Sequence, residues 1–208
     1  MLLPLLLAAL AFAANPAHGQ ALEGFHVVES VIGAGHGFQF TPQLRLRTGD
    51  RFRQLEQVRA GLIVAKSILP KVDLLAAGYY EPTVKQPQFP ASYRFQFGGQ
   101  ARLPISSRFN AQPRVLWERL NRTTGLAYRR VRFGGRLTWN AGKFTPYIYH
   151  ETFLVGGPET HFHSTRSGGG IGWNTEHRWR MEFEYFYDVR RAFWGGDRQV
   201  VSTRFQFR

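Results

Sequence analysis

The sequence of 208 residues predicts an all-β fold, a single antiparallel barrel. Three observations predict it. Apolar and polar residues alternate over segments of about ten residues, which is the side-chain period of a strand. Clusters of turn-forming residues separate these segments. The composition, with 22 glycines and 15% aromatic residues, suits strands joined by tight turns. The length fits one or two domains, and the absence of cysteine excludes disulfides and thiolate metal sites.

Residues 1–19 are predicted to be a secretory signal peptide. The apolar run Leu2–Ala14 is too short to span a bilayer, and small residues follow it. No Lys or Arg precedes this run, so a buried N-terminal helix is the alternative. Residues 20–35 are assigned to an N-terminal lead-in, although a lumen plug or an extra strand also fits this segment. Residues 36–208 are predicted to form the barrel.

The clearest strand signal lies in residues 93–103. Tyr93, Phe95 and Phe97 fall on one face, whereas Arg94 and Gln96 fall on the other. Four more segments alternate in the same way: 37–47, 130–139, 178–188 and 201–208. Five others are less regular but compatible with strands: 54–65, 71–81, 108–119, 144–154 and 164–174. The sequence therefore predicts about ten strands, with twelve as the upper count, each long enough for a tilted membrane-spanning strand.

The connections between these segments alternate in length. Turns near 66–71, 104–107, 140–143 and 174–177 are short, and connections at 82–92, 156–163 and 190–198 are longer. Those at 48–52 and 120–126 are intermediate. This asymmetry is typical of outer-membrane barrels, which have short periplasmic turns and longer outer loops. An even strand number would place both chain ends on the periplasmic side.

Which face turns inward decides between a soluble sandwich and a membrane barrel. Export and the charged faces, rich in Arg with a minority of Glu, favour a barrel with its polar face inside. In residues 178–188, Phe183 would then face lipid, opposite Glu182 and Glu184. Aromatic residues near strand ends are predicted to form interfacial girdles: Trp117, Trp139, Tyr147, Tyr149, Trp173, Trp179 and Tyr187.

The net charge of +13 comes almost entirely from arginine. In a narrow barrel, Arg and Glu on neighbouring strands are expected to form cross-strand ion pairs that fill the lumen. The lumen-lining candidates are Arg114, Glu118, Arg130, Arg132, Arg136, Glu151, Arg166, Arg178, Arg180, Glu182 and Glu184. A wider set of inward groups adds Arg45, Arg94, Arg102, Arg108, Arg204 and Asp188. The expected role is structural or that of a narrow passage with weak anion selectivity, and a small anionic ligand is a candidate partner.

Several motifs carry a family resemblance over roughly residues 36–208. They are "PRVLWERL" at 113–120, "YRRVRF" at 128–133, "PYIYHETF" at 146–153, "TRSGGGIGW" at 165–173 and "MEFEYFYD" at 181–188. In their order and spacing the chain resembles the DUF2490 family of Gram-negative proteins, which are regarded as β-barrels of unassigned function. The resemblance implies an outer-membrane location, with lipid and the barrel-assembly machinery as partners, and it supplies no activity. Phe207 is penultimate, whereas many such barrels end on an aromatic residue.

Catalytic and metal chemistry find little support in the sequence. His161 and His163 lack an evident third metal ligand beyond Glu159, so no metal is predicted. His163 and Ser164 are adjacent, and a regular strand would point them to opposite faces. We therefore expect no enzyme activity, no catalytic residue and no cofactor, with an outer-membrane lipid hydrolase as one alternative. The other alternative is a soluble secreted basic binding protein; nucleic acid is not expected, because the arginines are spread through nearly every strand.

Overall fold

The computed structural model describes residues 21–49, 51–82, 84, 91–123, 127–156, 161–175, 178–190 and 196–207. The predicted signal peptide lies outside these residues. The strands are β1 (Ala21–Ser30), β2 (Ile32–Gly33), β3 (Phe38–Gly49), β4 (Gln54–Leu69), β5 (Val72–Pro82), β6 (Ala91–Ala101), β7 (Leu103–Pro104), β8 (Phe109–Arg122), β9 (Ala127–Trp139), β10 (Phe144–Gly156), β11 (His161–Asn174), β12 (Trp179–Arg190) and β13 (Arg198–Phe207). Within the described chain, no helix is long and apolar enough to cross a membrane.

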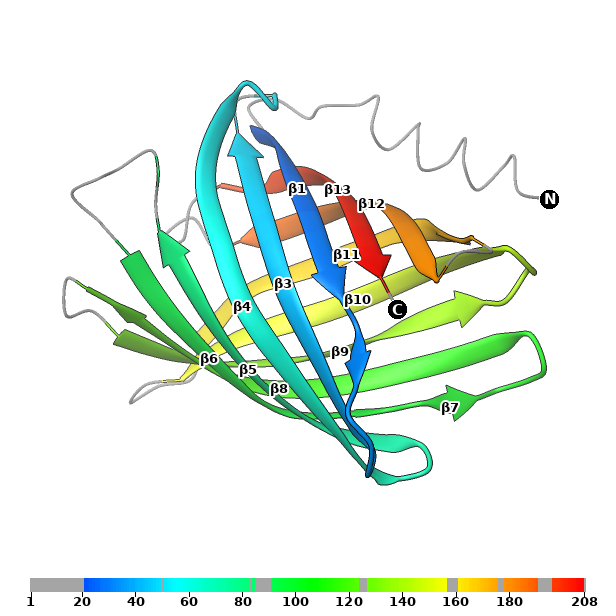
Figure 1. The fold of residues 1–208 in the computed structure, drawn as a ribbon. Helices are drawn as coiled ribbons and strands as arrows, with labels where there is room; N and C mark the ends of the chain where they lie inside the picture. Colours follow the sequence, from blue (N-terminus) through cyan, green and yellow to red (C-terminus); the bar gives the residue numbers. More distant parts are fainter. Residues whose placement is uncertain are drawn as a thin grey trace.

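The sheet closes on itself, which confirms the predicted barrel (Figure 1). Of its thirteen strands, β2 and β7 are two-residue pieces that pair only with β3 and β8. The remaining eleven strands form the wall, and each pairs antiparallel with its neighbours except at the closing seam. There β1 pairs with β13 in parallel, because an odd number of strands brings the first and last together pointing the same way.

All ten predicted strands are present, and β1 is the eleventh. For residues 20–35 the structure shows the alternative of an extra strand: residues 21–30 are part of the wall, and their assignment to a lead-in before the barrel is corrected. The distribution of apolar and polar residues along β1 does not identify it as a wall strand. Phe25 faces inward and packs with Phe186 and Val200, whereas His26 bonds outward-facing Thr203. The other strands were recognised by apolar residues on the face opposite to their charges, whereas in β1 Glu23 and Glu29 share the inward face with Phe25 and Val27.

The connections fall at the two ends of the barrel in the predicted alternation, although their lengths overlap: 102–108 has seven residues and 157–160 has four. The strand ends that flank the short turns at 70–71, 102–108, 140–143 and 175–178 lie together with the end of β13. The strand ends that flank 83–90, 157–160 and 191–197 lie at the other end. Because β1 runs parallel to β13, the wall begins at the end with the longer connections and finishes at the end with the short turns. The wall therefore does not begin and end on one side, as it would with an even strand number.

The wall is apolar outside and charged inside. Phe97, Val115 and Ile148 are 58%, 56% and 57% exposed on the outer surface. By contrast, the carboxylates of Glu81 and Asp188 belong to residues only 1% exposed, inside the barrel. This is the inverse of a soluble protein, in which charged residues are almost never fully buried unless paired.

Phe183 is 48% exposed on the outer face, as the alternation in residues 178–188 predicts. Two predicted girdle residues are misplaced. Tyr147 and Tyr149 point inward, and their hydroxyls donate to the carboxylate of Glu184 at 2.9 and 3.1 Å. They share a face with Glu151, and the strand period therefore carries them to the lumen.

Glycine permits close strand contact on the inner face. A Cβ atom on Gly134 would lie 2.7 Å from the Cα atom of Glu151, its partner on β10, and would overlap the carbonyl oxygen of His150. Real Cβ atoms do not approach backbone this closely. The close approach of β9 and β10 at this point therefore depends on the missing side chain.

Gly134→Ala is predicted to destabilise the barrel by about 1–3 kcal/mol, the usual cost of forcing extra atoms into a packed site. The matched control is Gly156→Ala on β10, where a Cβ atom would meet nothing within 4 Å. Urea unfolding of the refolded proteins, followed by tryptophan fluorescence, measures both. Equal midpoints for the two variants would contradict this account of the close approach.

Candidate functional site

The interior carboxylates are each held by several donors from neighbouring strands. Glu118 on β8 accepts hydrogen bonds from Gln96 Nε2 and Arg130 Nε, both at 2.6 Å. Arg94 and Arg132 lie 3.8 and 3.7 Å from its oxygens. Since β6 and β9 flank β8, one carboxylate joins three strands. The alternation of the strands builds this arrangement, because every second side chain points inward.

Other interior carboxylates also bind two arginines each, although not always from the flanking strands. Glu151 binds Arg132 at 2.6 Å and Arg114 at 2.5 Å. Glu182 binds Arg180 at 2.8 Å and Arg136 at 3.0 Å. The structure thus brings together on the inner face these predicted residues: Arg114, Glu118, Arg130, Arg132, Arg136, Glu151, Arg166, Arg180, Glu182 and Glu184.

Arg178 does not belong to this set. It is exposed, has a positive φ of 37° and precedes β12 in the turn. The strand begins one residue later than the alternation suggested, so the side chain never joins the wall. Arg108 is exposed in the turn before β8 for the same reason. Arg102 lies just beyond β6 and reaches Asp73 at 3.0 Å while its own side chain stays 48% exposed.

The closing seam carries ion pairs that the sequence did not predict. Arg198 on β13 binds Glu23 on β1 at 2.6 Å and Asp188 on β12 at 2.8 Å. Arg47 on β3 binds the other oxygen of Glu23 at 2.7 Å. These contacts link the first and last strands across the seam. Glu23 was missed because β1 was not recognised as a strand. The strand that pairs with β1 is remote in sequence, so no local pattern pointed to this pairing.

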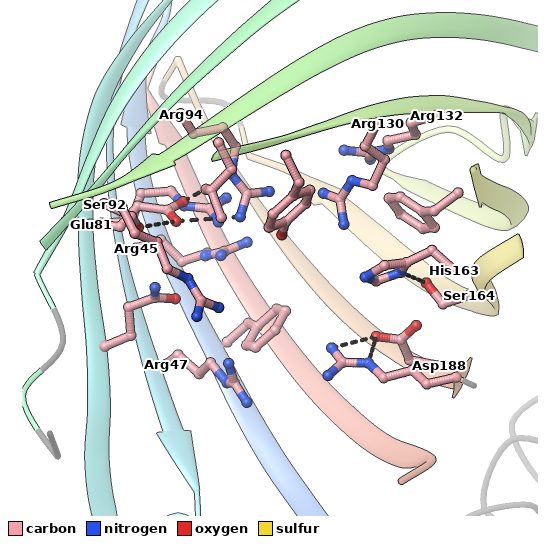
Figure 2. Close-up of a pocket in the computed structure, with 18 of the residues that line it drawn as sticks. Arg45, Arg47, Glu81, Ser92, Arg94, Arg130, Arg132, His163, Ser164 and Asp188 are labelled. Carbon is pink, nitrogen blue, oxygen red and sulfur yellow. Dashed lines mark hydrogen bonds and ion pairs between the residues drawn. The ribbon is translucent and has the colours of Figure 1, made fainter. Parts of the chain in front are cut away.

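A cavity of about 340 Å³ occupies the half of the lumen nearer the longer connections. Among the described residues, its lining includes only two carboxylates, Glu81 and Asp188. Ten arginines line it: Arg45, Arg47, Arg59, Arg94, Arg122, Arg130, Arg132, Arg166, Arg190 and Arg198. Figure 2 shows Arg45 and Arg94 on one side and the His163–Ser164 pair on another. Cationic groups from many strands therefore converge on one space.

Aromatic rings hold several of these arginines. The guanidinium carbons of Arg130, Arg132 and Arg166 lie 4.6, 5.4 and 5.3 Å from the centre of the Phe153 ring. Arg45 lies 4.6 Å from the centre of the Phe25 ring. A ring face attracts a cation but carries no net charge. These contacts therefore position the guanidinium groups without neutralising them.

His163 and Ser164 both face the cavity, although the regular alternation predicts opposite faces. Phe153 on β10 pairs with Ser164, and the next residue, Leu154, pairs with Phe162. His163 is thus the extra residue of a β-bulge, which re-aims its side chain. His163 Nδ1 and Ser164 Oγ lie 2.9 Å apart in a hydrogen bond, and both residues are buried. The parity argument from the sequence is wrong here, because it assumed an unbroken ladder.

The fold and the site define a closed, single-chain β-barrel with an apolar exterior and an interior network of arginines and carboxylates. The chain belongs to the DUF2490 family, described as protein of unknown function, whose profile matches residues 29–199. This match confirms the resemblance seen in the sequence motifs. No curated protein and no solved structure matches the chain.

Glu118→Gln is predicted to destabilise the barrel by about 3 kcal/mol, because it leaves buried arginines without their counter-charge. Glu56→Gln is the control. Glu56 is partly exposed and binds Arg47 at 3.3 Å, so its loss should cost less than about 1 kcal/mol. Urea unfolding measures both free energies. A Glu118 variant as stable as the Glu56 variant would show that the interior charges are solvated rather than mutually dependent.

Proposed function

We propose that this protein is an outer-membrane β-barrel whose lumen forms a narrow, electropositive passage for small anions. The observation that carries the proposal is the inverted wall, apolar outside and lined by arginine inside, with ten arginines against two carboxylates around the cavity.

The outer surface supports the membrane location. Large apolar side chains are exposed on strands all round the wall, including Leu44, Leu74, Phe133 and Phe205 at 36–44%. Soluble monomers rarely expose such a contiguous apolar surface. In a bilayer it would lie against hydrocarbon, and the closed sheet would leave no unpaired strand edge in the wall. The predicted signal peptide supplies the route, and the barrel-assembly machinery is the expected partner for insertion.

The excess of arginine supports the preference for anions. Most interior carboxylates already bind two or more arginines, so the cationic surplus at the cavity has few acidic groups left to offset it. A lumen of low dielectric strengthens the field of such a surplus. Small anions would therefore be concentrated in the cavity and cations excluded from it.

Phe183→Arg is predicted to lower the free energy of unfolding in lipid vesicles by about 2–4 kcal/mol, the cost of an arginine on the lipid face near the midplane. Phe183→Leu keeps the position apolar and should cost far less. Urea titration of vesicle-bound protein measures both variants. If the Arg variant inserts as well as the Leu variant and is as stable, Phe183 does not face lipid.

Reversal potentials in planar bilayers with a potassium chloride gradient are predicted to show a preference for chloride. Arg45→Glu should reduce this preference, because it replaces a cavity cation by an anion. Arg119→Glu makes the same charge change at an exposed, outward-facing position and should leave it unchanged. The preference should also weaken at high salt, which screens the field. Cation preference, or an equal response to both variants, would contradict an anion passage.

A barrel hydrolase is the second candidate function, and the hydrogen bond between His163 and Ser164 favours it. A serine hydroxyl beside an imidazole is the arrangement of an activated nucleophile and its base. Asp188 lines the same cavity and is the carboxylate available to orient the imidazole.

Release of fatty acid from phospholipid in mixed micelles tests the hydrolase. If it is one, Ser164→Ala should lower turnover by at least about 100-fold, the usual scale of a lost acid–base or nucleophilic group. Thr165→Ala, which removes a hydroxyl from the adjacent position, is the control. Wild-type protein that releases no fatty acid would eliminate this candidate and leave the passage unaffected.

A further inference from the structure

We propose that the cavity contains a binding site for a phosphate monoester group, with Arg45 on β3 and Arg166 on β11 as its cationic ligands. The inference rests on the proposed electropositive lumen and does not require that the lumen conducts.

Arg45 lacks a counter-charge. Within the described ranges it forms no ion pair and no hydrogen bond, and its one contact is the face of the Phe25 ring at 4.6 Å. The charged groups that line the cavity with Arg45 are mostly of the same sign, among them Arg59, Arg94 and Arg166. Of the two carboxylates in this lining, Glu81 already binds Arg59 and Arg94, and Asp188 binds Arg198. A partly buried guanidinium among like charges is stabilised when an anion joins it.

Arg166 approaches the same cavity from another part of the wall and is also incompletely satisfied. Its guanidinium lies over the rings of Phe153 and Phe186, with centre distances of 5.3 and 4.5 Å. Its Nη2 reaches Asp188 only at 3.4 Å, while Arg198 binds that same oxygen at 2.8 Å. Among the described residues, the buried Nε atom of Arg166 has no hydrogen-bond acceptor. The part of the side chain that stays exposed, 18%, lines the cavity and is what a ligand would meet.

The chemistry of these groups selects the ligand. Guanidinium groups present planar pairs of N–H donors that match the oxygens of phosphate. A doubly charged group offsets two arginines at once, which a halide or a single carboxylate does not. The cavity of about 340 Å³ lies at the lower end of the range for small-molecule sites. It therefore suits a small phosphorylated solute, or the phosphate headgroup of a lipid that enters from the barrel end.

The bulge at His163 adds polar groups to the same cavity. His163 and Ser164 line it together with Arg45 and Arg166. The hydroxyl and the imidazole are hydrogen-bonded to each other at the cavity wall, beside the arginines. In this proposal the bulge contributes polar groups to ligand binding, and no hydrolysis is required.

Isothermal titration calorimetry in neutral detergent at low ionic strength tests the site, with refolded full-length protein. The probes are inorganic phosphate, glucose 6-phosphate, dihexanoyl phosphatidic acid and glucose. We expect one site per barrel for the phosphate probes and no heat from glucose. Arg45→Gln and Arg166→Gln should each weaken phosphate binding by at least about tenfold, the scale of a lost charged hydrogen bond. Tightest binding of glucose 6-phosphate assigns the site to a solute, and tightest binding of phosphatidic acid assigns it to a lipid headgroup.

Arg102→Gln is the matched control, because it removes one positive charge from the opposite end of the barrel. It should change phosphate affinity by less than about twofold, since Arg102 does not line the cavity and binds Asp73. Equal weakening by Arg102→Gln and Arg45→Gln would overturn a specific site. Absence of phosphate binding to the wild type would overturn it too, while leaving chloride selectivity in bilayers intact.

Thermal unfolding supplies a second readout that guards against misfolded variants. Since Arg45 binds no carboxylate, Arg45→Gln should fold and be at least as stable as the wild type without phosphate. Phosphate should then raise the unfolding temperature of the wild type and not that of Arg45→Gln. Equal stabilisation of both proteins by phosphate would contradict the assignment of Arg45.

Discussion

Charged side chains enclosed by a narrow wall must find their partners inside it, and this constraint organises the whole structure. Removing an ion from water costs several kcal/mol, and only opposite charges and hydrogen bonds in the lumen can offset that cost. Glu118, Glu151 and Glu182 meet this condition by binding at least two arginines each. Glu118 binds arginines from both flanking strands, β6 and β9, and so joins three adjacent strands. The apolar exterior needs no such pairing if it lies against lipid.

Where the pairing is incomplete, the interior becomes chemically useful. In the half of the barrel near the short turns, Glu184 accepts from two tyrosines and Glu182 binds two arginines. In the other half, arginines rest on the rings of Phe25 and Phe153, which hold them without neutralising them. The cavity lies in this second half. The two halves thus separate a structural role for the ion pairs from a binding role for the arginine surplus.

Much of the fold follows from the sequence, because alternation is local. Residues 93–103 and 178–188 show both faces of the wall directly, and the structure places Phe97 and Phe183 outside as predicted. The predictions that failed concern pairing between segments that are far apart in the sequence. β1 is defined by pairing with β13 and β3, and its first residue, Ala21, lies 177 positions before its partner Arg198 in the sequence. The amino-acid sequence of β1 alone does not reveal that it pairs with β13 at the closing seam.

The candidate site likewise contains residues that the sequence predicts and residues that only the three-dimensional pairing reveals. Arg130, Arg132 and Glu151 were found because each sits on a regular strand. Ser164 and His163 were discounted because counting alternate positions along the strand cannot reveal a β-bulge. The bulge is set by pairing with Phe153. Arg45 was placed inside by its alternation, but its lack of a counter-charge appears only when every neighbouring strand is in position. Sequence patterns thus gave the faces of the strands, and the three-dimensional pairing determined which charges remain unbalanced.

The most direct test of the inverted barrel is the behaviour of the wild-type protein, expressed with residues 1–19, in fractionated cells. Outer membranes would be isolated and their proteins run on gels with and without boiling. The account predicts a band in the outer-membrane fraction that migrates differently once boiling unfolds the barrel. A soluble protein whose mobility does not change on boiling would contradict it, and the exposed apolar wall would then have to be covered by something other than lipid.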